Sequence, residues 1–135
     1  MKTAPRSKAL HIALLVVQIL VASVMLWAAF AKLIQPLEEL AKMLPWAEEH
    51  PSLVLLTGVV DLLGGLGIIL PTLLKIQPRL TVFASYGIIL LMVVGSIFHV
   101  SRGEANLIGF NILLIVLAVF IAWGRSTKGK VVARA

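Results

Sequence analysis

The chain alternates between long apolar runs and short polar connections. Four runs, at about residues 10–34, 51–70, 78–99 and 104–123, carry very few charges. Each run is long enough to cross a hydrocarbon core of roughly 30 Å as a helix, which takes about 20 residues. Four spans with short connections on alternating sides predict an all-α membrane protein, folded as an antiparallel four-helix bundle. We expect residues 1–135 to form this single domain.

A shorter amphipathic segment lies between the first two runs. Residues 36–44 place apolar side chains at helical spacing and charged side chains between them. Pro45 ends the segment and Trp46 follows it, in the type of position where tryptophan anchors a chain among lipid headgroups. The pattern predicts a short interfacial helix on the outer surface, with Trp46 at headgroup level.

The ends of the spans also have sequence signals. Pro71 predicts that the second helix stops at about residue 70, because proline removes a backbone donor. Gly124 predicts the end of the fourth span, with Arg125 in the cytoplasm beyond it. Glu48 and Glu49, just before the second span, suit the positive end of that helix.

Charges of opposite sign alternate between the connections. The N-terminus, the second connection and the C-terminus hold nine of the 12 basic residues: Lys2, Arg6, Lys8, Lys75, Arg79, Arg125, Lys128, Lys130 and Arg134. The first and third connections hold every acidic residue except Asp61: Glu38, Glu39, Glu48, Glu49 and Glu104. Because basic connections stay on the cytoplasmic side, this pattern predicts that both termini are cytoplasmic.

Composition agrees with a membrane protein and excludes several classes of function. The chain is 60% apolar and 13% charged, whereas soluble domains are nearer half apolar and a quarter charged. Its net charge of +6 is scattered, without stacking aromatics between the basic residues, so we expect contacts with membrane lipids and none with nucleic acid. The chain has no cysteine, which excludes disulfides and thiolate chemistry, and we expect no metal site.

Asp61 is the most informative polar residue. It lies ten residues after Pro51, about 15 Å along a helix, and therefore near the bilayer midplane. A carboxylate there costs at least about 2.5 kcal/mol unless it faces the bundle interior and finds a partner. Gly58 and Gly65 share its helix face. We expect these two glycines and Gly64 to be sites of close helix packing.

Other polar residues fall in the same half of the membrane, away from the termini: Lys32, His99, Asn106 and Asn111. Together with Asp61 they predict a ligand pocket that opens to the extracytoplasmic side or to the outer leaflet. Each has a structural alternative. Lys32 would snorkel to the headgroups, His99 would cap its helix and Asn111 would bond a neighbouring helix. On straight helices Lys32 is offset from Asp61 by about 10 Å, so a direct ion pair requires tilt or a bridging water.

Three stretches resemble the DoxX family in order and spacing. They are Phe30-Ala31-Lys32-Leu33, the run from Gly58 through Asp61 and Gly64-Gly65 to Pro71, and His99-Val-Ser-Arg102-Gly103-Glu104 followed by Asn111. The likeness extends over about residues 19–125. It implies a small bacterial inner-membrane protein with four spans, and the matching positions are Lys32, Asp61, His99 and Asn111. Many relatives carry Glu in place of Asp61.

The resemblance leaves several functions open. The family is named after a subunit linked to thiosulfate and quinone oxidation, and other relatives are discussed in oxidative-stress or assembly complexes. Our leading hypothesis is therefore a subunit of a redox-associated complex that binds a quinone or similar amphipathic molecule. The alternatives are an assembly or chaperone partner that docks through residues 36–44, and a small proton-coupled exporter.

The sequence also bears on haem binding, dimerisation and signal-peptide cleavage. A haem would require His50 and His99 to face one iron, and we do not expect one. The glycine faces would also suit a homodimer. Residues 29–31 have the form of a signal-peptidase site, but the apolar stretch before them is too long for a signal peptide, so we expect the first span to be retained.

Overall fold

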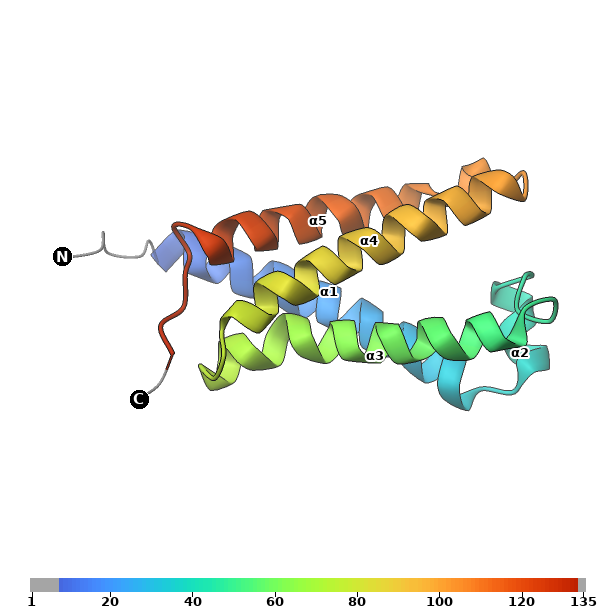
Figure 1. Cartoon of the computed structure of the whole chain (residues 1–135), viewed down its shortest axis with the longest axis horizontal. Coiled ribbons are helices and arrows are strands. Elements are labelled where there is room, and N and C mark those ends of the chain that lie inside the picture. Colours follow the sequence, from blue (N-terminus) through green and yellow to red (C-terminus); the bar gives the residue numbers. More distant parts are fainter. Residues whose placement is uncertain (1–7, 134–135) are drawn as a thin grey trace.

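The computed structural model describes residues 8–133, apart from the side chain of Leu107, and over that range it contains helices and connections but no strand. In chain order the elements are α1 (Lys8–Ile34), α2 (Leu37–Met43), α3 (Pro51–Leu74), α4 (Arg79–Ser101), the 3-10 turn η1 (Ala105–Leu107) and α5 (Gly109–Ser126) (Figure 1). The helices α1, α3, α4 and α5 are each long and apolar enough to cross a membrane, which confirms the four predicted spans. The basic residues Lys2, Arg6 and Arg134 lie outside the described residues.

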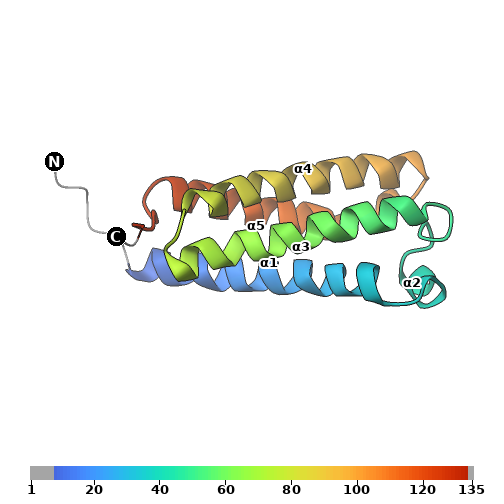
Figure 2. The same ribbon diagram turned by 60° about the horizontal axis from the view of Figure 1, so that its bottom comes forward.

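The four long helices pack as a bundle in which successive helices run in opposite directions (Figures 1 and 2). The most extensive contacts join α1 to α3 and α4 to α5, and the two pairs meet through α3 with α4 and α1 with α5. Both ends of the described chain lie at one end of the bundle, which we call the terminal end. The short helix α2 lies at the opposite end, which we call the α2 end (Figure 2).

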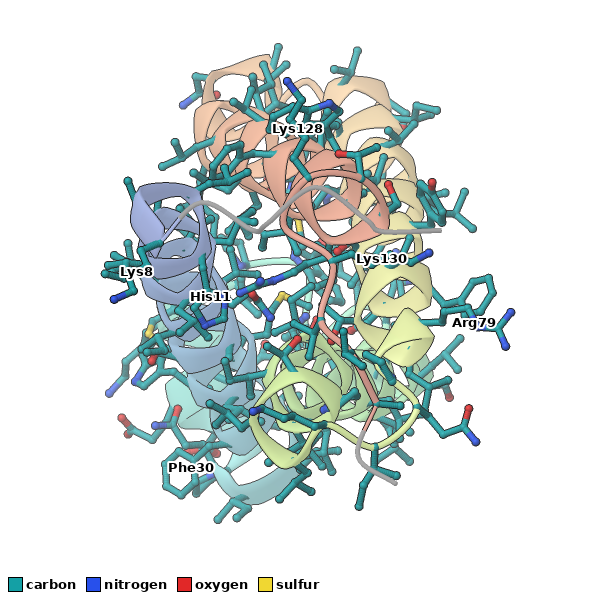
Figure 3. The ribbon with its side chains drawn as sticks, turned by 90° about the vertical axis from the view of Figure 1, so that its left-hand side faces the viewer. Lys8, His11, Phe30, Arg79, Lys128 and Lys130 are labelled. Atoms are coloured by element: carbon teal, nitrogen blue, oxygen red, sulfur yellow. The ribbon has the colours of Figure 1, made fainter. Side chains whose placement is uncertain are left out.

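Charged side chains are segregated between these two ends. Figure 3 looks onto the terminal end, where the basic residues Lys8, Arg79, Lys128 and Lys130 lie around the helices. The acidic residues of the connections belong to α2, to the segment after it and to the segment before η1, all at the α2 end. This segregation is the arrangement that a transmembrane bundle with both termini on one side requires.

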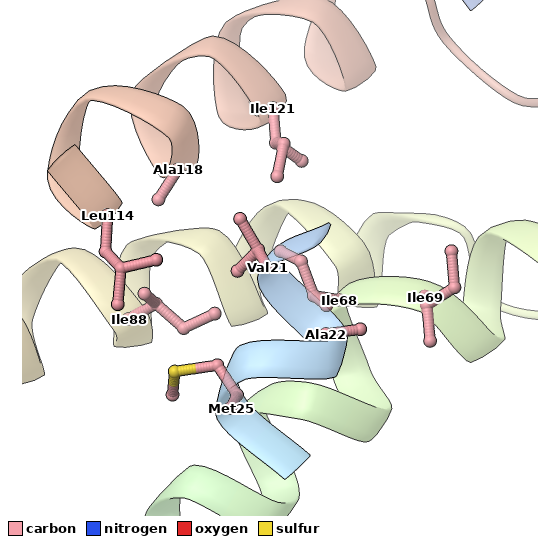
Figure 4. Close-up of a cluster of buried hydrophobic side chains, with 9 residues drawn as sticks. All are labelled: Val21, Ala22, Met25, Ile68, Ile69, Ile88, Leu114, Ala118 and Ile121. Atoms are coloured by element: carbon pink, nitrogen blue, oxygen red, sulfur yellow. The ribbon is translucent and has the colours of Figure 1, made fainter. Parts of the chain in front are cut away.

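The bundle has an apolar core and an apolar exterior. Nine buried side chains from all four long helices form the main cluster, which is shown in Figure 4: Val21, Ala22, Met25, Ile68, Ile69, Ile88, Leu114, Ala118 and Ile121. Many large apolar side chains point outward instead, among them Leu55, Leu63, Leu90 and Ile97. Apolar residues on both sides of a helix are expected where lipid replaces water as the surrounding phase.

The segment from α2 to α3 is more deeply packed than the sequence suggested. Leu40 of α2 is buried against the bundle together with Ala31 and Val54, so α2 covers the α2 end as predicted. Trp46, which we expected at headgroup level, is only 6% exposed and belongs to the same buried cluster. Protein therefore surrounds the indole, while its depth in the membrane stays a prediction.

The helix α3 does not stop at Pro71 but continues to Leu74, which corrects the predicted end. Proline removes one backbone donor, and a membrane helix tolerates it where neighbouring groups bond the freed backbone. Here the side chain of Gln18, fully buried on α1, donates from Nε2 to the carbonyl of Ile68 at 2.7 Å and to Thr72 Oγ1 at 3.0 Å. These bonds hold the turn that contains the proline, next to the carbonyl of Gly67 that Pro71 leaves without its usual donor.

The fourth span also differs from its predicted limits. Residues 105–107 form a 3-10 turn, and α5 then runs from Gly109 through Gly124 and Arg125 to Ser126. Gly124 continues the helix because it is a packing site, where an added Cβ would lie 2.5 Å from Leu14 Cδ2. Arg125 is buried and donates from Nε to Gln18 Oε1 at 2.7 Å, so it belongs to the interior of the bundle.

Candidate functional site

A cavity of about 400 Å³ lies between the helices at the α2 end. Residues of α1, α2, α3, α4 and α5 all line it, and most of them are apolar. Four of its polar residues were predicted as site residues, one from each long helix: Lys32, Asp61, His99 and Asn111. Its volume is within the range of small-molecule sites, and apolar walls with a few convergent polar groups are typical of such sites.

Lys32 and Asp61 form a direct ion pair inside this cavity. The distance from Lys32 Nζ to Asp61 Oδ2 is 2.8 Å, and the two side chains are 15% and 2% exposed. The offset expected between them is overcome by the tilt of α1 across α3 (Figure 1) and by the length of the lysine side chain. The Lys32 ammonium therefore binds Asp61, the only acidic residue of the four spans, instead of extending to the headgroups without a partner.

The glycines of α3 bring α1 close enough for this pair to form. A Cβ on Gly58 would lie 2.9 Å from Leu33 Cδ2 and 3.0 Å from Lys32 Cβ. A Cβ on Gly65 would lie 2.9 Å from Leu26 Cδ2, and one on Gly64 would lie 3.3 Å from Met25 Cε and from Ile88 Cγ1. The three glycines therefore lie at helix contacts, and α1 occupies the space beside Gly58 and Gly65.

His99 is held by a chain of polar contacts at the α2 end. Its Nδ1 lies 3.3 Å from Glu104 Oε1, and Arg102 Nε donates to the same oxygen at 3.0 Å. Arg102 Nη1 also donates to Glu49 Oε2 at 2.6 Å. Glu49 thus binds Arg102 in the connection after α4, whereas we expected it to interact with the positive N-terminal end of α3. We call the Glu49–Arg102–Glu104 contacts the strap, because they join the connection before α3 to the connection after α4.

The strap is expected to weaken in acid. The hydrogen bond from Arg102 lowers the pKa of Glu49, and contact with His99 followed by that with Arg102 lowers the pKa of Glu104. A carboxyl group whose pKa is lower in the folded than in the unfolded protein stabilises the folded state at any pH above its unfolded-state pKa, which is about 4.3 for glutamate. This contribution is lost as the pH falls through the folded-state pKa. We therefore expect amide exchange in residues 44–50 and 102–106 to accelerate, relative to its intrinsic rate, as the pH falls below about 4.3.

Hydrogen exchange followed by mass spectrometry measures this effect segment by segment. Glu49→Gln removes one of the two titrating contacts and should reduce the acid response, while Glu48→Gln, at a neighbouring position for which no strap contact is seen, is the matched control. An acid response that is the same in both variants would contradict the role of Glu49.

Asn111 and Asn106 have different environments. Asn111 lines the cavity and its Nδ2 lies 3.4 Å from both Met92 O and Ser96 Oγ, so its bonds to α4 are long. Asn106 lies in η1, is exposed and does not line the cavity. The structure therefore brings four of the five predicted side chains together and leaves Asn106 outside.

Two aromatic residues that sequence reasoning did not assign to the site connect its polar groups. The Lys32 ammonium lies 6.0 Å from the centre of the Trp46 ring, at the limit of a cation–π contact. Trp46 packs edge-on against Phe98 with 5.6 Å between ring centres, and Phe98 packs against the His99 ring at 5.9 Å. Phe98 lies in an apolar run and carries no sequence signal that would distinguish it from an ordinary core residue, and the position of Trp46 after Pro45 favoured a headgroup contact.

The indole Nε1 of Trp46 is buried and has no hydrogen-bond acceptor within the described part of the chain. Buried tryptophan usually bonds through this group.

The two histidines named for a haem are not brought to one space. His99 lines the cavity, whereas His50 is exposed and does not line it, although its ring also packs against Phe98 at 5.8 Å. Among the described residues no group of three or more His, Cys, Asp or Glu side chains is arranged to hold a metal ion.

Comparison with known families agrees with the motifs. The sequence model of the DoxX-like family matches residues 16–121, a stretch that includes Lys32, Asp61, His99 and Asn111. Searches of curated proteins and of solved structures found no match. Because the family match covers most of the sequence, including α3, α4 and the larger part of α1 and α5, the chain belongs to the DoxX-like family.

Proposed function

We propose that this protein binds a quinone or a similar amphipathic molecule in the cavity at the α2 end, as a subunit of a redox-associated complex in the bacterial inner membrane. The observation that carries the proposal is the convergence of Lys32, Asp61, His99 and Asn111 on one mainly apolar cavity. Burying a polar side chain inside a membrane costs free energy. Four polar side chains around one space are best explained by the polar head of a ligand that they bind.

The polar groups have unused capacity to hold such a head. The Lys32 ammonium has three donors, and Asp61 accepts from one of them. Glu104 contacts Nδ1 of His99, which leaves Nε2 of that ring without a partner among the described residues. A carbonyl or hydroxyl oxygen of a ligand would accept from Lys32, or from Asn111 Nδ2 in exchange for one of its two long bonds to α4. His99 Nε2 would donate or accept according to its protonation.

The predicted orientation directs the cavity outward. Both ends of the described chain lie at the terminal end, and the cavity lies at the other end. With the termini cytoplasmic, as the distribution of basic residues favours, the cavity would lie in the outer half of the inner membrane. Its ligand would then be exchanged on the extracytoplasmic side.

The assembly hypothesis receives less support from α2. The segment proposed to dock a partner protein uses Leu40 inside the bundle, and Leu40, Met43 and Leu44 line the cavity. Leu40 is thus directed towards the protein's own interior, while Leu37 and Met43 are 39% and 46% exposed. A stoichiometric partner recovered with the protein, without any enriched small molecule, would favour assembly over ligand binding.

Mass spectrometry of the gently purified protein tests the proposal. We expect an enriched small molecule in the extract of the parent protein, and binding of a decyl-substituted benzoquinone as the probe. Asn111→Leu should weaken binding of the probe by about 3- to 10-fold, the value of one hydrogen bond of roughly 1 kcal/mol. Asn106→Leu is the matched control because Asn106 does not line the cavity. Equal affinities of these two variants would refute the role of Asn111, and absence of binding to the parent protein would refute the proposal.

A further inference from the structure

The two helix pairs, α1 with α3 and α4 with α5, separate from each other towards the α2 end (Figure 1). The hydrogen bond from Arg125 to Gln18 and the packing of Leu14 on Gly124 hold α1 and α5 together in the terminal half. From there the two helices diverge towards the α2 end (Figure 1). The cavity occupies the space between them, since residues from the last third of α1 and the start of α5 line it.

The side chains at this separation face two environments at once. Trp27 of α1 and Phe110 of α5 both line the cavity, yet they are 59% and 54% exposed. In a membrane bundle a side chain that is half exposed in this region contacts lipid. Two further lining residues are exposed, Val94 of α4 (55%) and Met43 of α2 (46%). Since the cavity lies between α1 and α5, we take the gap between Trp27 and Phe110 as its opening to lipid and call it the α1/α5 opening.

The route from the aqueous side is covered by contrast. At the α2 end the strap joins Glu49 to Arg102, and Trp46 packs under it against Phe98. Leu40 and Trp46 are buried there, although both line the cavity. A molecule arriving from water would have to separate these contacts or pass the exposed side chain of Met43, whereas one dissolved in the membrane would meet the apolar side chains of the α1/α5 opening.

From these contacts we infer that the ligand enters sideways from the outer leaflet through the α1/α5 opening, and that it is a lipid-soluble molecule with a long alkyl or isoprenoid chain. The inference rests on the proposed function. The cavity of about 400 Å³ is near the lower end of the range for small-molecule sites, so it accommodates a polar head and a short part of the chain. The head reaches Lys32 and the rest of the chain remains between Trp27 and Phe110, in contact with lipid.

Cross-linking tests this route because the natural chain has no cysteine. In a Trp123→Phe background, the pair Trp27→Cys and Phe110→Cys is joined by short bis-maleimides across the α1/α5 opening. Trp46 is then the only tryptophan left, and quenching of its fluorescence by the decyl-substituted benzoquinone reports entry into the cavity in nanodiscs. We expect the bridge to slow entry at least tenfold relative to the same variant before cross-linking.

The matched control places the bridge across the strap, with Glu49→Cys and Arg102→Cys, which the structure already holds together, in a Trp27→Phe and Trp123→Phe background so that Trp46 is again the only tryptophan. Bridging that pair should leave the entry rate within a factor of two. Slower entry with the strap bridged and unchanged entry with the α1/α5 opening bridged would overturn lateral access while preserving ligand binding. Failure of the parent protein to bind the probe would overturn the proposed function itself, and with it this inference.

Discussion

Replacing Asp61 with leucine is expected to lower the free energy of unfolding by about 3–5 kcal/mol, the usual cost of leaving one partner of a buried ion pair alone. The Lys32 ammonium would lose its partner at 2.8 Å in a cavity with mainly apolar walls. No other acidic residue lies in the four spans to replace Asp61. Unfolding in mixed micelles of dodecyl maltoside and sodium dodecyl sulfate, followed by circular dichroism, measures the change.

A double variant separates the ion pair from the packing around it. Lys32→Met combined with Asp61→Leu removes both charges and keeps side chains of similar length, so it should recover most of the lost stability. The double variant should nevertheless lose binding of the benzoquinone probe, because its head would meet no ammonium. A single Asp61→Leu variant as stable as the parent would show that Lys32 reaches the headgroups without a partner, and the ion pair would then have no structural role.

The four spans were predictable because of a constraint that acts on each helix separately. A chain in lipid must satisfy its backbone bonds within each segment, so long apolar runs identify the spans without knowledge of their neighbours. The ends of the spans depend on those neighbours. Gln18 supports α3 through Pro71, and Leu14 packs on Gly124 inside α5. Neither contact leaves a local signal in the residues at the helix end.

The site was predictable in its polar residues and unpredictable in their contacts. Asp61 and Lys32 were identified because charges are rare within apolar runs. Their direct pairing depends on the tilt of α1 across α3, which the sequence does not specify. In the sequence Arg125 resembles the neighbouring basic residues that set the orientation in the membrane. Its burial depends on a hydrogen bond to Gln18, which is 107 residues away in the chain. Asn106 could be placed outside the cavity only once η1 was defined.

Gly65→Leu is expected to destabilise the bundle by about 3 kcal/mol, at the upper end of the usual range for overpacking. A Cβ at this position would already lie 2.9 Å from Leu26 Cγ and 3.3 Å from the backbone nitrogen of Leu26. A side chain can change rotamer, but the backbone of α1 can respond only by moving away from α3. Helix association in lipid depends on close packing, without a hydrophobic driving force between helices, so this separation is not offset.

Gly87→Leu is the matched control, since a Cβ on Gly87 would meet nothing within 4 Å. Leucine also favours a helix more than glycine does, so this variant should be unchanged or more stable by up to about 1 kcal/mol. Because Gly58 and Gly65 hold the same pair of helices together, moving α1 away at Gly65 should also lengthen the Lys32–Asp61 pair. Gly65→Leu should therefore weaken binding of the probe as well as stability. Equal stabilities of the Gly65 and Gly87 variants would mean that α1 and α3 are not in contact at Leu26. The close approach of the two helices that brings Lys32 to Asp61 would then be contradicted.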